Sequence, residues 1–321
     1  MERDTRSSLF QALAAISLMA GAAAAQAAGP VGRLVVFGDS NVDSGGLFSL
    51  TQQHYPAPPR WQGRDSNGPV VSEYVAELLG AQLYSHAVGG ATTGTHNVVS
   101  ASYPQYSRLN GTGLTWQLDE FGQAGGRLVG HEVALLWIGS NDLVGAQRAN
   151  RSDLDRRIAA ARANIELALE RLYALGARRI VVATRTPRMT LGSDDDLNGV
   201  DLNVAIKAAA VAVKQRTAAD IRLYDAYAAI ADMIRNPSNY GFTQVSQQCI
   251  AVPACVNDVY GDGQAVGETF VHWDSAHKTT RVHRLMAEQL VDLLSRCSGA
   301  SSTGPARPPW VGYACTAALP D

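Results

Sequence analysis

Short apolar runs that alternate with amphipathic segments constrain the fold of this chain more than any other feature. Two of the runs, residues 34–37 and 131–138, are apolar almost throughout, which is typical of strands buried on both faces. Between the runs lie segments with apolar residues at helical spacing, and residues 153–175 form the longest of these. This alternation predicts a parallel β-sheet with helices on both faces.

The predicted elements cover most of the chain between residues 34 and 294. Strands are expected at residues 34–37, 82–88, 131–138, 179–183 and 221–224, and helices at residues 69–79, 153–175, 200–218 and 279–294. Residues 92–115 are polar and irregular, so we expect them to form part of a substrate cleft. Residues 236–269 are expected to be a loop-rich insertion.

The first 27 residues resemble a signal peptide. An apolar stretch at residues 9–25 leads to Ala25-Gln26-Ala27, which has the small residues of a cleavage site. Glu2 and Asp4 are unusual in such a segment and leave a membrane anchor as the rival interpretation. We expect an exported protein, periplasmic or secreted, whose residues 28–296 form a single domain, with a C-terminal tail at residues 297–321.

Charge and length limit the classes of function. The formal net charge is −2 and the pI is near 6.4, and no basic cluster occurs, which argues against nucleic-acid partners and against electrostatic binding to anionic lipid. After removal of the leader, about 290 residues would remain, enough to bury a large core. No later stretch has the length and apolarity of a membrane span.

All four cysteines fall in the last third of the chain. An even number in an exported protein suggests two disulfides, for which three connectivities are possible. We favour Cys249–Cys255 and Cys297–Cys315, because each closes a local loop and the second would tie down the tail. The clustered CxxC spacing that would favour a metal or redox site is absent.

A hydroxyl, an imidazole and a carboxylate stand at opposite ends of the chain. Ser40 follows the apolar run at residues 34–37, and Asp274 precedes His277 by three residues. At that spacing a carboxylate can hydrogen-bond to the imidazole, whose other nitrogen can activate a serine. Taken alone, Ser40 is more simply a helix cap after a strand, and the Asp274/His277 pair is open to the same interpretation. The pattern G-x-S-x-G does not occur around Ser40, which disfavours the usual α/β-hydrolase fold.

Two further positions can supply hydrogen bonds to an oxyanion. Asn141 follows the strand at residues 131–138, and its side-chain amide is a candidate donor, although it could simply cap a helix. Gly89-Gly90 follows the strand at residues 82–88, where glycine lets the backbone approach a ligand, or only forms a turn. His272 and His283 raise a metal alternative, but neither an HExxH motif nor a cluster of carboxylates accompanies them.

Four separated blocks resemble the GDSL, or SGNH, hydrolases, and in particular the plant-type GDSL esterase/lipases and exported bacterial esterases. The blocks are Phe37-Gly38-Asp39-Ser40 with Asp43 and Gly45, Ala87-Val88-Gly89-Gly90-Ala91, Ile138-Gly139-Ser140-Asn141-Asp142, and Trp273-Asp274 with His277. The segments around Gly63-Arg64 and Asn236-Pro237 also have counterparts in that branch. The resemblance covers roughly residues 33–296.

The resemblance implies a flavodoxin-like three-layer α/β/α sandwich with a five-stranded parallel sheet. It implies Ser40 as nucleophile, completed by Asp274 and His277, and oxyanion donors from the Ser40 and Gly90 N–H groups and the Asn141 side chain. Gly89 is the fallback for Gly90. No metal or organic cofactor is implied.

The sequence departs from the family pattern at three positions near these blocks. Asn41 replaces the leucine that usually follows the serine, Lys278 replaces a proline, and His86 stands where asparagine is frequent. No catalytic group is lost, so the departures bear on substrate choice.

We therefore expect a serine esterase or lipase that cleaves small-molecule or lipid carboxylic esters through an acyl-serine. An acyltransferase with the same intermediate is the alternative, and a non-catalytic exported lipid- or glycan-binding protein is a third possibility. The substrate head group, the acyl-chain length and the oligomeric state are not readable from the sequence.

Overall fold

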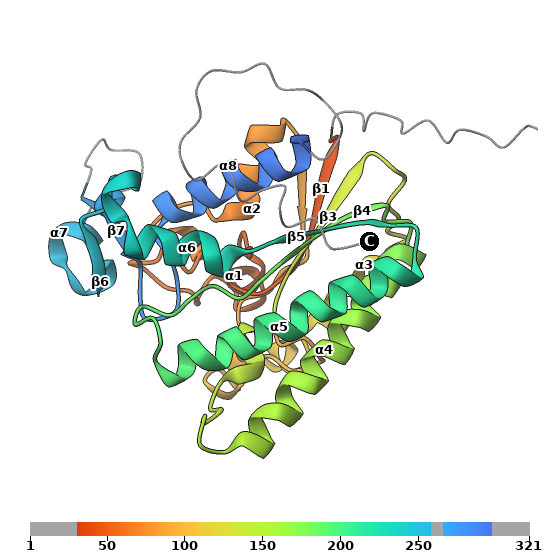
Figure 1. Ribbon diagram of the computed structural model, residues 1–321, viewed down its shortest axis with the longest axis horizontal. Coiled ribbons are helices and arrows are strands. Elements are labelled where there is room, and N and C mark those ends of the chain that lie inside the picture. Colours follow the sequence, from red (N-terminus) through yellow and green to blue (C-terminus); the bar gives the residue numbers. More distant parts are fainter. Residues whose placement is uncertain (1–30, 258–265, 297–321) are drawn as a thin grey trace, which may run out of the picture.

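The computed structural model describes residues 31–257 and 266–296, and its centre is a five-stranded parallel sheet with the strand order β2-β1-β3-β4-β5. This is the doubly wound order of flavodoxin-like folds. A second pair of parallel strands, β6 and β7, lies at one end of the molecule (Figure 1). The strands are β1 (Arg33–Gly38), β2 (Gln82–Ser85), β3 (Glu132–Trp137), β4 (Arg179–Ala183), β5 (Asp220–Tyr224), β6 (Gln244–Gln248) and β7 (Phe270–His272). The helices are α1 (Gly46–Leu50), α2 (Val71–Leu79), α3 (Leu114–Gln123), α4 (Arg151–Ala174), α5 (Asp194–Arg216), α6 (Ala226–Arg235), α7 (Pro253–Val256) and α8 (Thr280–Arg296).

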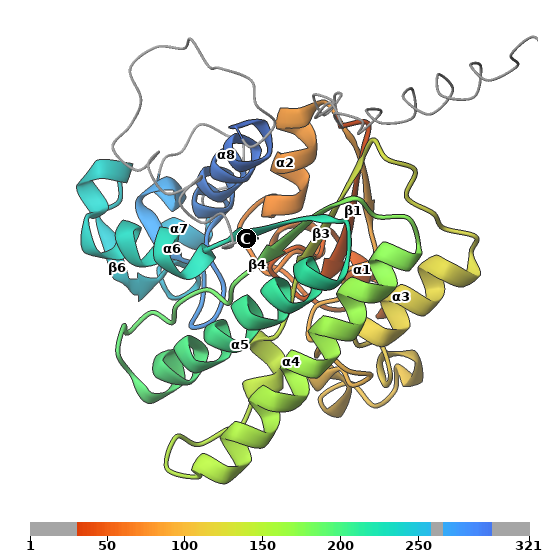
Figure 2. The same cartoon turned by 45° about the vertical axis from the view of Figure 1, so that its right-hand side comes forward.

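Alternate residues of the central strands pack into two different hydrophobic cores. Val35 and Phe37 face the layer formed by α3, α4 and α5, whereas Leu34 and Val36 face α2, α6 and α8. Figures 1 and 2 show α4 beside α5 on one side of the sheet and α2 beside α8 on the other. Since side chains alternate along a strand, an apolar run such as residues 34–37 can fill both cores. The predicted three-layer α/β/α architecture is confirmed.

Most predicted elements are present, with differences at their ends. The strand at residues 179–183 and the end of α2 before Gly80 agree with the prediction, and Gly80 adopts a positive φ of 61° that terminates the helix. Helix α5 starts at Asp194, six residues earlier than predicted, because the Ser193 side chain accepts a hydrogen bond from the N–H of Asp196. Strand β2 ends at Ser85 rather than at residue 88. Helices α3 and α6 were not predicted.

The loop-rich insertion carries the first predicted disulfide. Cys249 and Cys255 are bonded, their Cα atoms lie 5.3 Å apart, and both are fully buried beside Trp273. This confirms one of the two expected pairs. The pair Cys297–Cys315, the expected signal peptide and the C-terminal tail lie outside the described residues.

Among residues 31–257 and 266–296, no helix is both long and apolar enough to cross a bilayer.

Candidate active site

The carboxyl ends of three neighbouring strands bring together residues that are far apart in the sequence. Ser40 follows β1, Gly90 follows β2 and Asn141 follows β3, and β1 lies between the other two strands. Because the strands are parallel, their carboxyl ends meet at one edge of the sheet, where functional groups gather in α/β proteins. The structure thus places three of the predicted site residues on adjacent loops.

Ser40, His277 and Asp274 form a continuous chain of hydrogen-bonding groups. The distance between Ser40 Oγ and His277 Nε2 is 2.9 Å, and His277 Nδ1 lies 2.9 Å from each carboxylate oxygen of Asp274. Asp274 Oδ1 also accepts the N–H groups of Ala276 and His277, which closes the turn that precedes α8. The two predicted ends of the chain are therefore brought into one site.

Hydrogen bonds of the backbone distinguish Gly90 from Gly89. The N–H of Gly89 donates to Asp43 Oδ2 at 2.7 Å, so this group is already used. By contrast, the N–H groups of Ser40 and Gly90 donate to no acceptor within the described part of the chain. Gly90 rather than Gly89 therefore has a donor to offer to a ligand.

Gly90 adopts a backbone conformation that favours glycine. Its φ is +81°, and a Cβ atom at this position would lie 2.5 Å from both Asn97 Oδ1 and Val99 Cγ2. The fully buried Asn97 shapes this turn: its Nδ2 donates to the carbonyl of Gly89, and its Oδ1 accepts the N–H of Val99. Packing and hydrogen bonds of Asn97 and Val99 therefore hold this turn.

Asn141 and Asp142 connect the loop after β3 to the loop after β2. Asn141 Nδ2 donates to the carbonyl of Ala91 at 2.9 Å, and Asp142 accepts hydrogen bonds from the N–H and the hydroxyl of Thr93. One of the two amide hydrogens of Asn141 remains available. The Asn141 side chain therefore braces the neighbouring loop and does not cap a helix, and its second amide hydrogen stays a candidate donor to an oxyanion.

Asp43 braces the site from the loop after β1. Its carboxylate accepts the N–H groups of Gly45, Gly46, Leu47 and Gly89. These bonds start the short helix α1 and tie it to the Gly89-Gly90 turn. Asp43 belongs to the first motif block, yet its role could not be read from the sequence, because its partners come from two separate loops.

Arg60 and Asp65 are site residues that sequence analysis missed. Arg60 donates from Nη2 to Asp274 Oδ2 at 3.1 Å and from Nε to Asp65 Oδ1 at 2.9 Å. Asp65 Oδ2 in turn lies 3.9 Å from His277 Nε2. Both residues stand in an irregular loop, and only their position beside the Gly63-Arg64 block could have drawn attention to them.

The pKa values of His277 and Asp274 reflect these neighbours. Burial by itself lowers the pKa of His277, but the charge of Asp65 and the bond to Asp274 outweigh burial and raise it above the ordinary value of 6.5. Burial tends to raise the pKa of Asp274, but the hydrogen bond and charge of His277 outweigh it and hold this pKa far below its ordinary value. The arrangement thus keeps Asp274 ionised and makes the imidazole a stronger base.

Asp39, next to Ser40, is a fully buried carboxyl group. Its Oδ1 accepts hydrogen bonds from the N–H and the side-chain amide of Asn41, whereas its Oδ2 accepts none within the described residues. Burial raises the pKa of Asp39 to about 6 despite these bonds. Asn41, one of the three departures from the family pattern, therefore supports Asp39.

The other two departures from the family pattern, Lys278 and His86, also make contacts inside the protein. The ammonium of Lys278 is fully buried and donates to the carbonyls of Pro187 and Ala276. His86 stacks on Phe37 with 5.3 Å between ring centroids. Lys278 thus fixes the loop that carries His277, and His86 covers the end of β2.

His272 and His283, the residues of the metal alternative, lie apart from a ligand cluster. His272 is fully buried and its ring nitrogens have no partner within the described residues, and His283 Nδ1 accepts the N–H of Val71. In residues 31–257 and 266–296, no group of three or more His, Cys, Asp or Glu side chains is arranged to hold a metal ion.

A hollow of about 470 Å³ adjoins Asn141. The loop at residues 92–98 and helix α4 line it, with polar groups from Thr92, His96, Arg157 and Asn164. The stretch predicted to border a substrate cleft therefore borders a hollow beside a candidate oxyanion donor.

Comparison with known proteins assigns the chain to a family. The family model described as GDSL-like Lipase/Acylhydrolase matches residues 34–290, which is most of the chain. The chain is similar to a thermolabile hemolysin of Vibrio parahaemolyticus, with 28% identity over 82% of this chain and 63% of that protein. It is also similar to a phosphatidylcholine-sterol acyltransferase of Aeromonas hydrophila, with 27% identity over 68% of this chain and 65% of that protein.

The chain thus spans somewhat less than two thirds of the length of these two relatives. Among solved structures, a member of the lipolytic G-D-S-L family from Veillonella parvula aligns with a TM-score of 0.47 and 14% identity, covering 82% of this chain and 98% of that one. The match of the family model agrees with the resemblance seen in the four sequence blocks. The chain belongs to the GDSL-like lipase/acylhydrolase family.

Proposed function

We propose that this protein is a serine esterase or lipase that hydrolyses carboxylic esters through an acyl-enzyme on Ser40. The hydrogen bond of 2.9 Å between Ser40 Oγ and His277 Nε2, with Asp274 on the opposite nitrogen, is the observation that carries the proposal. Family membership supports the same class of reaction. Ester hydrolysis needs an activated nucleophile and donors for an oxyanion, and the site offers both.

In the first step, Ser40 Oγ attacks the ester carbonyl while His277 Nε2 accepts the serine proton. Asp274 holds the imidazole in the tautomer that leaves Nε2 unprotonated and stabilises the imidazolium that forms. The negative charge on the carbonyl oxygen is met by the N–H groups of Ser40 and Gly90 and the side-chain amide of Asn141. Collapse breaks the bond to the leaving alcohol, which takes the proton from His277.

Ser40→Ala tests the proposal. We expect a loss of at least about 10³-fold in the hydrolysis of nitrophenyl esters, because the nucleophile is removed. Ser152→Ala is the matched control, since this serine is exposed on α4. A Ser40→Ala variant with full activity would refute the mechanism. Failure of a fluorophosphonate probe to label Ser40 in the folded protein would instead favour a non-catalytic binding protein.

An acyltransferase is the second candidate. The similarity to the acyltransferase of Aeromonas hydrophila favours it, and the same acyl-enzyme would serve both reactions. Incubation with a lipid acyl donor and a competing alcohol separates the two, because transfer gives a new ester and hydrolysis gives only free acid. Exclusive hydrolysis would exclude transfer to that alcohol.

Export from the cytoplasm is part of the proposal. The disulfide between Cys249 and Cys255 and the leader-like composition of residues 1–27 both support an oxidising compartment. Expression with fractionation, followed by N-terminal sequencing of the mature protein, tests it. A cytoplasmic protein that keeps residues 1–27 would refute export.

Substrates of this site are small-molecule or lipid esters, and no nucleic-acid partner is expected at a net charge of −2. Acyl-chain length and head group are the two substrate properties to vary. A panel of nitrophenyl esters of increasing chain length, together with choline and aryl esters, provides that profile.

A further inference from the structure

Asp65 presents a second carboxylate to the nitrogen of His277 that faces Ser40. The distance between Asp65 Oδ2 and His277 Nε2 is 3.9 Å, and the side chain of Asp65 is 6% exposed. Its other oxygen, Oδ1, accepts a hydrogen bond of 2.9 Å from Arg60. Within the described residues, Oδ2 accepts no hydrogen bond. One oxygen is therefore fixed, and the other is available to a ligand.

The available oxygen also lies beside the Gly89-Gly90 turn. A Cβ atom built on Gly89 would be 3.5 Å from Asp65 Oδ2. The oxygen thus stands near both His277 Nε2 and the turn that carries the free N–H of Gly90. Those are the groups that flank a reacting carbonyl in the proposed mechanism, so Asp65 borders the reaction itself.

We propose that Asp65 orients the water molecule that hydrolyses the acyl-enzyme and thereby favours hydrolysis over transfer to alcohols. This inference rests on the proposed function. A separation of 3.9 Å is too long for a direct hydrogen bond but suits a bridging water with a bond of about 2.8 Å to each group. Once Ser40 is acylated, its Oγ no longer has a proton to share, and His277 Nε2 is free to bind that water.

Deacylation by this water proceeds in two stages. The water oxygen attacks the acyl carbon while one of its protons passes to His277 Nε2, and its second O–H donates to Asp65 Oδ2. The tetrahedral intermediate then collapses, the bond between the acyl carbon and Ser40 Oγ breaks, and the proton on His277 passes to Ser40 Oγ. A carboxylic acid leaves, and Ser40 is restored as a hydroxyl.

The number of O–H groups separates water from an alcohol. An alcohol has one O–H, which it must give to His277 in order to react. It then leaves Asp65 Oδ2 without a donor and places its carbon substituent near a carboxylate. Water satisfies both acceptors at once, so Asp65 gives an advantage to hydrolysis that an uncharged site of the same shape would lack.

Asp65→Asn in the full chain tests this role. With a nitrophenyl ester as donor and methanol as the competing acceptor, we expect the ratio of methyl ester to free acid to rise about tenfold, the effect of one charged hydrogen bond. The burst of nitrophenol, which reports acylation, should change much less than the steady-state rate, which reports deacylation. Asp65→Ala removes the whole carboxylate group and should raise the ratio of methyl ester to free acid by the same factor.

Glu73→Gln is the matched control, because Glu73 also pairs with an arginine of this loop, Arg64, but contacts no residue of the site. Its product ratio should equal that of the unaltered protein. An unchanged ratio in both Asp65 variants, with Ser40 still labelled by a fluorophosphonate, would overturn the role of Asp65 alone. If the Asp65 variants lost burst amplitude and steady-state rate equally, Asp65 would have a merely structural role, and this result would also overturn the proposal. Absence of an acyl-enzyme in the unaltered protein would refute the proposed function itself.

Discussion

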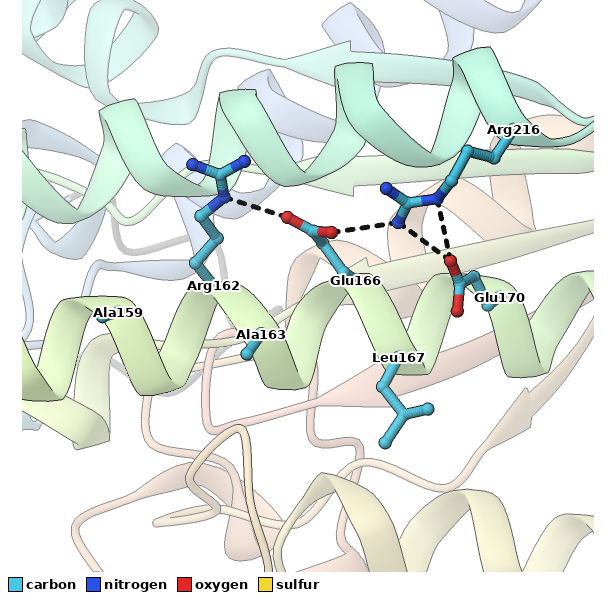
Figure 3. A pocket seen from close by; sticks show the side chains of 7 residues that line it. All are labelled: Ala159, Arg162, Ala163, Glu166, Leu167, Glu170 and Arg216. Carbon is cyan, nitrogen blue, oxygen red and sulfur yellow. Dashed lines mark hydrogen bonds and ion pairs between the residues drawn. The ribbon is translucent and has the colours of Figure 1, made fainter.

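Two networks of arginine and carboxylate side chains in this protein have nearly the same bond lengths and very different surroundings. The first, called here the surface network, joins Arg162, Glu166, Glu170 and Arg216 across α4 and α5, as Figure 3 shows. Its N–O distances are 2.8 to 3.0 Å, and both arginines are about half exposed. It lines a shallow surface hollow of about 470 Å³.

The second, called here the site network, joins Arg60, Asp65, Asp274 and His277. Its direct hydrogen bonds measure 2.9 to 3.1 Å, but its side chains are only 6 to 22% exposed. Water screens the first network and is largely excluded from the second. Distance alone therefore does not decide what an ion pair does. An exposed pair contributes little to stability, whereas a buried charge controls the protonation of its neighbours.

Removal of the central arginine from each network should give the largest contrast. We expect Arg60→Ala to lower kcat/KM for a nitrophenyl ester by about 10²-fold, because Asp274 and Asp65 lose the cation that holds them in place. Arg216→Ala should leave kcat/KM within about twofold. Steady-state kinetics of both purified variants measures the two values of kcat/KM. Equal effects of Arg60→Ala and Arg216→Ala would contradict the expected difference between the networks.

Lys278, the buried neighbour of His277, should affect the free energy of unfolding in a way that the exposed surface network does not. Burial lowers its pKa from 10.5 to about 7. Between these pH values the unfolded chain binds more protons than the folded one, so this group makes stability rise with pH and fall as pH decreases. Relative to the unaltered protein, Lys278→Met should therefore gain stability as pH falls from 10 to 7, with a slope that approaches about 1.4 kcal/mol per pH unit. Urea denaturation of both proteins at several pH values measures this slope. A difference in the free energy of unfolding that does not change with pH would refute the prediction.

The acidic limb of the pH–rate profile tests the electrostatic effect of Asp65. A neutral His277 is needed as base, and its pKa is raised, so activity should fall with decreasing pH at a higher pH than an ordinary imidazole would give. In Asp65→Asn the limb should move to lower pH, because a negative charge near the imidazolium is gone. Within the described residues, Asp39, Asp65, Asp274, Lys278 and His283 interact electrostatically with His277, and Arg60 is bonded to Asp274 beside it. If the acidic limb of Asp65→Asn stayed in place, the other groups, and not Asp65, would set the pKa of His277.

The smallest effect is expected from the surface network. Arg216→Ala should shift the melting temperature by no more than about 2 °C in low salt, and the shift should vanish in 1 M NaCl, since exposed pairs are weak and screened. Thermal denaturation at both salt concentrations checks this. A larger shift that persists in high salt would show that bridging α4 and α5 matters for the fold.

Local patterns predicted the elements whose formation is itself local. The strand at residues 179–183 has an apolar, β-branched run, and α2 ends at a glycine that can adopt a positive φ. Helix α6 was missed because Asp225 was not recognised as its cap, and α3 because its start at Leu114 lies in a stretch expected to be irregular. The early start of α5 was missed because Ser193 was not recognised as its cap.

The candidate site divides in the same way. Residue types and spacing alone predict that Ser40, Asp274 and His277 carry complementary chemistry, and the four motif blocks add Gly90 and Asn141 as candidate oxyanion donors. Folding separates Gly89 from Gly90 as candidate donors, since Asp43 accepts the N–H of Gly89. It alone placed Arg60 and Asp65 against Asp274 and His277, which are more than 200 residues away in the chain. A motif records which groups are present, but the distance between two charges and their exclusion from water arise only when the chain is folded.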